Sequence, residues 1–230
     1  MRNRDCGRTR QRIAAAVARA AALMLLLALA APRPASAAGE SPAAPTAASG
    51  IIDTDPGLLI ESAAQEMLRD LDAHRADYRK APDKVNALVD RVLLPHFDTE
   101  YSGRLVLGRH WNTASAGQRQ RFVNSFYHSL LNSYGAALLE FTDDRLKVLP
   151  YRGDPAATSA TVRTLVRKSD GSAVAVNYSL HRTAKGWMAW DVIIEGISYV
   201  KSFRDDFGAE IEQNGVESLI ARLETAGSAK

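Results

Sequence analysis

The sequence predicts an α+β domain that follows an export signal. Three observations lead to this prediction: apolar residues recur at helical spacing over residues 58–139, the period changes to two over four short segments, and helical spacing returns after residue 198. Helices, an antiparallel meander and further helices in this order are typical of the α+β class.

The first 37 residues have the pattern of a secretory signal peptide. Arginines precede the apolar stretch AALMLLLALAA, and ASA at 35–37 supplies the small residues that signal peptidase needs. The apolar stretch is well short of the roughly 20 residues that span a bilayer, which argues against a retained anchor. We therefore expect a signal peptide over 1–37 and cleavage after Ala37.

Removal of the signal changes the charge and the cysteine content. Residues 1–37 hold seven of the 29 basic and one of the 26 acidic residues, so 22 basic and 25 acidic residues remain, a net charge of −3. The isoelectric point of 9.1 therefore belongs to the signal, and charge gives no case for nucleic-acid binding. Cys6, the single cysteine, leaves with the signal. We expect a soluble exported protein without a disulfide, a thiol nucleophile or a lipid-modified cysteine.

The mature chain divides into a leader, one domain and a short tail. Residues 38–57 are rich in Ala, Pro, Ser and Gly without periodicity, which predicts a disordered linker. The domain covers 58–225, and 226–230 form the tail. The first two helices of the domain are predicted over 58–78, where the sequence is amphipathic, and over 83–94, where Pro95 ends the helix.

Two further helices precede the strands. A short one is expected over 98–111, with Asp98 as its N-cap. A long one follows over 115–141, where Ser115 and Gln118 have capping-box spacing. Its interior has a continuous aromatic and leucine stripe but also asparagines and serines, so we expect a helix packed inside a domain on nearly every side rather than a membrane span.

Four segments of alternating residues predict a four-stranded antiparallel meander. They are RLKVLPY, ATVRTLVRK, AVAVNYSLHR and GWMAWDVIIEG, joined by a hairpin at KSDGS and a turn at Gly186. Two closing helices, over 198–213 and 216–224, are separated at Asn214-Gly215.

Alternation gives each strand one apolar and one partly charged face. In the fourth strand Met188, Trp190, Val192 and Ile194 share the apolar face, and Asp191 and Glu195 lie opposite. The Cα atoms of the two acids are about 13 Å apart. That spacing is poor for a glycosidase pair, whose carboxyl groups are roughly 5–9.5 Å apart. We expect both acids to form structural cross-strand pairs on the outer face.

Motifs of known catalytic or metal chemistry are absent from the sequence. The five histidines show no metal-binding spacing, and there is no G-x-S-x-G, P-loop or G-x-G-x-x-G. This lowers the expectation of an enzyme, and no cofactor or metal is predicted. The excess of apolar and aromatic residues fits either one packed core or a ligand cavity; periodicity favours the core but does not separate the two.

Two segments carry a family resemblance. VLLPHFDTEYSGRLVLGRHWNTASAGQRQRFVNSFYHSLLNSYGAAL and GWMAWDVIIEGISYVKSFRDDFGAEI closely resemble the periplasmic phospholipid-binding proteins of the Mla pathway, also called the toluene-tolerance auxiliary family. The similarity runs from about Leu58 to Leu223. It implies a curved NTF2-like sheet packed against helices, a helical subdomain, and an internal apolar cavity for acyl chains.

The resemblance also implies a function. Proteins of this kind are soluble periplasmic carriers in a Gram-negative envelope. The implied partners are an outer-membrane lipoprotein–porin complex and an inner-membrane ABC transporter with a ring-forming lipid-binding subunit. Moving phospholipid between these two complexes would maintain outer-membrane lipid asymmetry. Candidate lipid-binding residues are Leu105, Trp111, Phe122, Phe126, Leu130, Tyr134, Leu138, Val148, Val162, Val174, Val176, Tyr178, Trp190, Val192 and Ile194.

Two alternatives remain open on the sequence alone. An NTF2-like enzyme acting on a small apolar substrate needs a His/Asp or Tyr/Asp set aimed into the cavity, for example His181 with Asp191. A non-lipid envelope scaffold needs a fully packed interior. The sequence specifies neither a head group nor a direction of transport, and it does not distinguish phospholipid from a hopanoid-like lipid.

Overall fold

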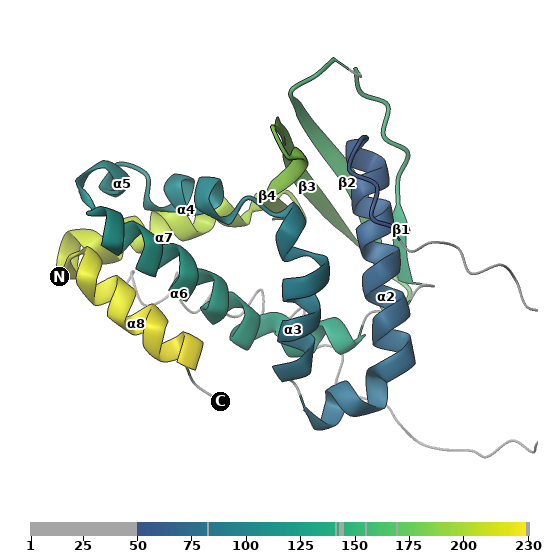
Figure 1. Ribbon diagram of the computed structural model, residues 1–230, viewed down its shortest axis with the longest axis horizontal. Coiled ribbons are helices and arrows are strands. Elements are labelled where there is room, and N and C mark those ends of the chain that lie inside the picture. Colours follow the sequence, from purple (N-terminus) through teal and green to yellow (C-terminus); the bar gives the residue numbers. More distant parts are fainter. Residues whose placement is uncertain are drawn as a thin grey trace, which may run out of the picture. The chain divides into compact units, whose positions relative to one another are not determined.

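The computed structural model describes residues 50–81, 83–140, 142, 145–154, 156–168 and 170–228. The predicted signal peptide, its cleavage site and most of the predicted linker lie outside the described residues. Within these ranges an antiparallel sheet packs with helices, as the sequence predicts (Figure 1). No helix of the described residues combines the length and the apolarity that crossing a membrane requires.

The first helix, α2 (Pro56–Lys80), begins earlier than predicted because its start is strongly capped. The Asp55 side chain accepts hydrogen bonds from the backbone N–H of Gly57 at 2.7 Å and of Leu58 at 3.0 Å, and Pro56 occupies the first turn. Helix α3 (Asp83–Val92) follows, and the 3₁₀ turn η1 (Leu94–His96) contains Pro95. The predicted linker over 38–57 is therefore too long by two residues, because residues 56–57 belong to α2.

The predicted helix over 98–111 is two helices. Asp98 caps α4 (Thr99–Leu107), accepting from the Tyr101 N–H at 2.9 Å, which confirms the predicted cap. The chain then turns at Gly108, whose φ of 54° favours glycine, before α5 (His110–Thr113).

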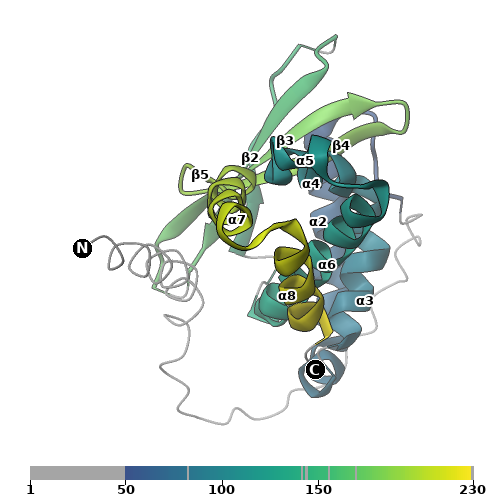
Figure 2. The ribbon, with the colours of Figure 1, turned by 90° about the vertical axis from the view of Figure 1, so that its left-hand side faces the viewer.

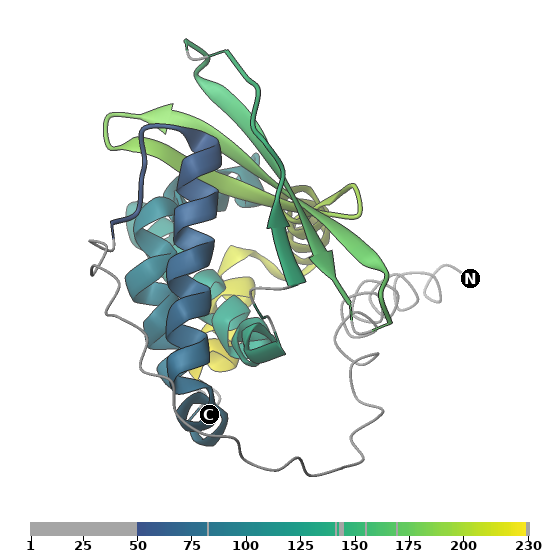
Figure 3. The ribbon, with the colours of Figure 1, turned by 90° about the vertical axis from the view of Figure 1, so that its right-hand side faces the viewer.

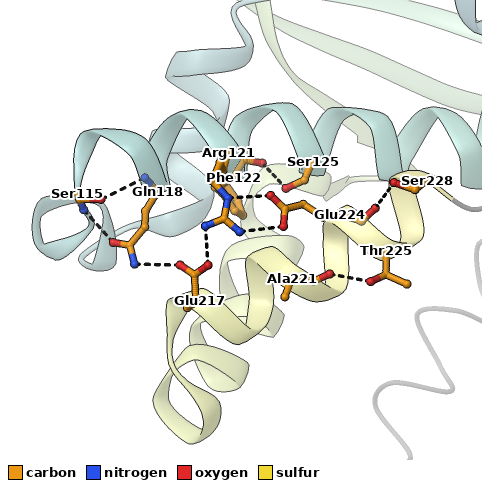
Figure 4. A network of polar contacts seen from close by, with 10 residues as sticks. All are labelled: Ser115, Gln118, Arg121, Phe122, Ser125, Glu217, Ala221, Glu224, Thr225 and Ser228. Carbon is orange, nitrogen blue, oxygen red and sulfur yellow. Dashed lines mark hydrogen bonds and ion pairs between the residues drawn. The ribbon is translucent and has the colours of Figure 1, made fainter.

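The capping box of the long helix α6 (Ala116–Tyr134) is confirmed. The Ser115 hydroxyl accepts from the Gln118 N–H at 3.2 Å, and the Gln118 side chain accepts from the Ser115 N–H at 3.0 Å (Figure 4). The prediction that this helix is packed on nearly every side is wrong, because Asn124 and His128 lie on an exposed face. Its last predicted turns form the 3₁₀ helix η2 (Gly135–Glu140).

The sheet has five antiparallel strands in the order β1-β2-β3-β4-β5, not four. Strands β1 (Leu146–Val148), β2 (Ser159–Arg167), β3 (Ala173–Thr183) and β4 (Gly186–Ile194) match the predicted segments. The additional strand β5 (Ile197–Ser198) follows a tight turn at Glu195 and Gly196, both with positive φ. Two residues are too few to show a period of two, so the pattern did not reveal this strand.

A β-bulge divides β4 into two segments with opposite alternation. The register pairs Ser179 with Asp191 but Leu180 with Ala189, so Trp190 is the extra residue. Residues that pair directly point to the same face. Val192 and Ile194 therefore share a face with Ala189 and Trp187, whereas Trp190 does not, and the predicted grouping of Trp190 with Val192 and Ile194 is wrong.

Asp191 is buried rather than paired on an outer face. Its side chain is 3% exposed and accepts hydrogen bonds from the Ser198 hydroxyl at 2.6 Å and the Val200 N–H at 3.0 Å. It thus holds the start of α7 (Tyr199–Asn214) against β4. Glu195 is exposed, and its carboxylate accepts from the Ala175 N–H at 2.6 Å. Neither acid forms the predicted cross-strand ion pair.

Helices α7 and α8 (Val216–Ser228) are separated at Gly215, as predicted, and pack with α4 and α6 around one core (Figure 2). On the exposed side of this bundle, Arg121 of α6 binds Glu217 and Glu224 of α8 (Figure 4). A second core joins α2, α3 and η2, and a third joins α2 to the sheet.

Candidate functional site

The face of the sheet that meets α2 is apolar and consists of two halves with different burial. We call one the closed half, which lies under α2 toward the β3–β4 turn (Figure 3). The other, the open half, lies toward the β2–β3 hairpin. The closed half consists of Val162, Leu180, Trp187 and Ala189. The open half consists of Val174, Val176, Tyr178, Val192 and Ile194.

The closed half is a packed core. Leu59 of α2, 1% exposed, contacts a cluster in which Val162 is 0% and Leu180 is 1% exposed. At this packing density a further ligand could enter only by displacing side chains. This part of the sheet therefore serves to hold α2.

The open half has the same kinds of side chain but incomplete burial. Its five members are all only half-buried, although their backbones pair in register, Val176 with Ile194 and Tyr178 with Val192. The hydroxyl of Thr164, which lies beside them on β2, donates to the Val176 carbonyl oxygen at 2.8 Å and so is satisfied within the sheet. Charged side chains do not occur among these members.

A second set of incompletely buried apolar side chains comes from α6 and α7. Leu130, Tyr199 and Phe203 are half-buried, and Tyr134 is 40% exposed. Phe203 connects this set to the helical core, with its ring centroid 5.0 Å from that of Phe126. It also lies 6.1 Å from the ring of Tyr199. We call these four residues the α6–α7 wall.

Burial raises the pKa of one tyrosine in each set, Tyr178 and Tyr199. Burial raises the pKa of the Tyr178 phenol, against a hydrogen bond with Thr164 that lowers it. Burial also raises the pKa of Tyr199, and the neighbouring Tyr134 adds to that shift. The two sets therefore offer apolar surface with uncharged hydroxyls, which suits an acyl chain better than an ionic substrate.

The structure distributes the sequence-predicted site residues over several environments. Val174, Val176, Tyr178, Val192 and Ile194 come together in the open half, and Leu130 and Tyr134 in the α6–α7 wall. Leu105, Leu138 and Val148 are also half-buried, of which Leu138 and Val148 pack against the α2 cores.

Other predicted site residues do not offer free surface. Phe122, Phe126 and Trp111 are at most 9% exposed in the core of the helical bundle, and Val162 is covered by α2. Trp190 lies on the opposite side of the sheet, where its ring packs at 5.6 Å from that of Tyr101. These residues support the site through packing.

Two wall residues, Tyr199 and Phe203, were missing from the predicted site. They stand four apart at the start of α7, and this spacing places them on one helix face. The sequence signal was visible but identical to that of Phe207, which is buried in the core. Only the position of α7 relative to β4 distinguishes the two roles.

His181 pairs with Asp98 and not with Asp191, the partner named as an example in the sequence analysis. His181 Nε2 lies 3.0 Å from Asp98 Oδ2, and the ring of Tyr101 packs on His181 at 4.6 Å. Asp191 is bound to Ser198 and Val200 instead. Within the described ranges, no group of three or more His, Cys, Asp or Glu residues is placed to hold a metal ion.

Comparisons with known proteins relate the chain to one family. The family model described as MlaC protein matches residues 61–225. The chain is 30% identical over 161 residues to the toluene tolerance protein ttg2D of Pseudomonas putida, covering 70% of this chain and 74% of the relative. It is 22% identical over 183 residues to the intermembrane phospholipid transport system binding protein MlaC of Haemophilus influenzae, covering 78% and 86%.

A solved structure has the same fold. The phospholipid-binding protein of Ralstonia solanacearum, determined in complex with a phospholipid, superposes with a TM-score of 0.68 at 24% identity. The match covers 74% of this chain and 94% of that chain.

Proposed function

The chain belongs to the MlaC family, and from this premise we propose that it binds the acyl chains of a phospholipid between the open half of the sheet and the α6–α7 wall. The carrying observation is that apolar side chains on both elements are left half-buried while the closed half of the same sheet is completely packed. An acyl chain would complete the burial that α2 provides elsewhere.

Tyr178 supports an internal space at this place. Its ring packs against the closed-half cluster, burial raises the pKa of its phenol, and yet the side chain is only half-buried. A half-buried ring at the border of a packed core is what we expect of a side chain that lines a ligand cavity. The names of two similar proteins, which refer to phospholipid binding and intermembrane phospholipid transport, point to the same ligand.

The energetics favour a carrier. Two acyl chains hold about 30 methylenes, and at about 0.8 kcal/mol each their exposure to water would cost on the order of 24 kcal/mol. An apolar cavity removes most of this barrier and resembles the bilayer interior, so lipid can leave as readily as it enters. Direction then comes from partners, which we propose to be an outer-membrane lipoprotein–porin complex and an inner-membrane ABC transporter with a ring-forming subunit. This shuttling would maintain the lipid asymmetry of the outer membrane.

Mass spectrometry of the purified protein tests the proposal. We expect one two-chain phospholipid per protein in native spectra, and lipid extraction to identify its head group. Protein that purifies repeatedly without any lipid would refute the carrier. Turnover of a small apolar substrate by lipid-free protein would instead favour the NTF2-like enzyme.

The place of action is proposed to be the periplasm of a Gram-negative cell, reached through the signal at 1–37. Intact mass of protein from the periplasmic fraction should correspond to a chain that begins at Ala38. A species that still contains Cys6 would contradict cleavage at this site.

A further inference from the structure

An open pocket of about 350 Å³ lies beside β2, away from the site described above. It is lined by Pro150, Tyr151, Arg152, Gly153, Thr161 and Arg163. Thr161 and Arg163 alternate along β2 with Val162 and Thr164, so their side chains belong to the outer face of the sheet. The volume is at the lower end of the range for small-ligand sites.

The arginines of this pocket differ from most of the other arginines that the structure describes. Other arginines have an acidic or aromatic partner: Arg69, Arg75, Arg91, Arg109, Arg121, Arg204 and Arg222 form ion pairs, and Arg104, Arg119 and Arg182 lie over aromatic rings. Arg152 and Arg163 form no ion pair with any described residue, and the pocket lining contains no carboxylate.

Protection of a sheet edge does not account for these charges. Cations on edge strands discourage the addition of a foreign strand. Arg163, however, belongs to β2, which is paired on both sides by β1 and β3. Arg167, which follows Leu165 on the same face of β2, is also exposed and without an ion pair among the described residues. The outer face of β2 is thus a local concentration of unneutralised guanidinium groups.

The pocket also has a defined wall. The Tyr151 side chain lies so close to Gly153 that a Cβ at this position would stand 1.9 Å from the tyrosine hydroxyl. Gly57 is likewise closely covered by the Tyr151 Cβ, at 2.8 Å from an added Cβ. The two glycines therefore allow the aromatic ring to pack beside Arg152 as one side of the pocket.

We propose that this pocket binds a phosphate group through Arg152 and Arg163, with Thr161 as a further donor. Guanidinium groups match phosphate oxygens with paired N–H donors, and a phosphate accepts from several directions at once. A small pocket suits a single phosphate better than an extended acidic peptide. In our proposed function the acyl chains of a carried lipid lie against the opposite face of the sheet. We therefore take the ligand of this pocket to be either free phosphate or the head group of an anionic lipid in a membrane.

Two probes distinguish these sources on the full, lipid-loaded chain. Inorganic phosphate is titrated calorimetrically, and sedimentation is measured with vesicles of phosphatidylcholine with or without phosphatidylglycerol. The test variant is Arg152→Gln/Arg163→Gln. The matched control is Arg79→Gln/Lys80→Gln, which removes the same charge from exposed positions at the end of α2.

We expect the test variant to bind at least about tenfold more weakly than wild type and the control to bind as wild type does. If the test variant loses binding of inorganic phosphate, the ligand of the pocket is free phosphate. If it loses only binding to phosphatidylglycerol vesicles, the ligand is the lipid head group. Equal loss in control and test variants, or no binding of either probe to wild type, overturns the proposal. Binding of an acidic peptide in place of both probes, abolished in the test variant, also overturns it.

Gly153→Ala tests the shape of the pocket without changing its charge. Because the new methyl group would displace Tyr151, we expect weaker binding of the same probe. Unchanged binding would show that surface charge alone attracts the phosphate, and would refute the proposal that the pocket binds it. The bound lipid of all variants should stay as in wild type, so this result is separate from that of the carrier proposal.

Discussion

The closed and open halves of the sheet are built from the same kinds of residue and differ only in what covers them. Leu180 and Val176 lie on the same face of β3. Leu180, under α2, is 1% exposed, whereas Val176 is only half-buried. An apolar strand face thus does not by itself specify a core. The neighbouring helix decides whether the face stabilises the fold or remains accessible to a ligand.

A charge placed in each half should give the largest contrast. Leu180→Glu puts a carboxylate into a packed core, where it has no partner and no water, and we expect no folded protein. Val176→Glu should fold, because the carboxylate can be hydrated once lipid is absent, but it should purify empty. Thermal unfolding and lipid mass spectrometry on both variants check this. A folded Leu180→Glu, or a lipid-loaded Val176→Glu, would remove the distinction between the halves.

Truncation of two aromatic residues on α7 should separate core from wall. Phe207 is 6% exposed and contacts Phe122 and Phe126, so Phe207→Ala should lower the free energy of unfolding by about 3–5 kcal/mol. Phe203→Ala removes a half-buried ring and should cost less, while reducing the amount of bound lipid. Urea unfolding of delipidated protein and lipid quantification measure the two effects. Equal destabilisation with unchanged lipid would place Phe203 in the core.

Asp191→Asn tests the attachment of α7 to the sheet. The amide keeps one acceptor oxygen but presents an NH₂ group toward either Ser198 or Val200, so we expect a loss of about 1–3 kcal/mol in the free energy of unfolding. Glu195→Gln, at an exposed position, is the control and should change little. Lipid should still bind to both variants at temperatures where they are folded. A smaller loss for Asp191→Asn than for Glu195→Gln would contradict this attachment.

The smallest expected effect concerns the contact of α2 with α3, away from the sheet. Burial would raise the pKa of Asp70, but hydrogen bonds from Tyr78 and His74 and the charge of Arg91 lower it below its ordinary value of 3.8. The carboxylate therefore stabilises the fold above about pH 4, and this contribution is lost as pH falls through the lowered pKa. Asp70→Asn should cost roughly 1 kcal/mol at neutral pH. The difference from wild type should narrow in unfolding curves below pH 4; a gap that widens there would reverse the assignment.

Local chemistry explains which elements the sequence could predict. The capping box at Ser115, the cap at Asp98 and the turn at Gly215 depend on neighbouring residues, and all three are present. The break at Gly108 and the short strand β5 escaped because one glycine or two residues alter no periodicity. The bulge at Trp190 had the largest consequence, since one extra residue reversed the assignment of faces along part of β4.

The site was predictable only in part for a related reason. The period of two correctly grouped Val174, Val176 and Tyr178, because no irregularity interrupts β3 there. It could not tell that Val162 is covered and Val176 is not, since this depends on where α2 crosses the sheet. Nor could it tell that Phe122 faces α7 and α8 rather than a ligand. Such differences depend on contacts between residues far apart in the sequence.

The contact between α6 and α8 has a consequence for how the chain reaches its folded state. Arg121 binds Glu224, a residue 103 positions later, and the same helix pair buries Phe122 against the C-terminal helices. The apolar side of α6 therefore remains uncovered until nearly the whole chain has been synthesised. Chains whose core depends on contacts between residues far apart in the sequence fold slowly and expose apolar surface until these contacts form. A truncation before Val216 should accordingly aggregate rather than yield a smaller stable domain.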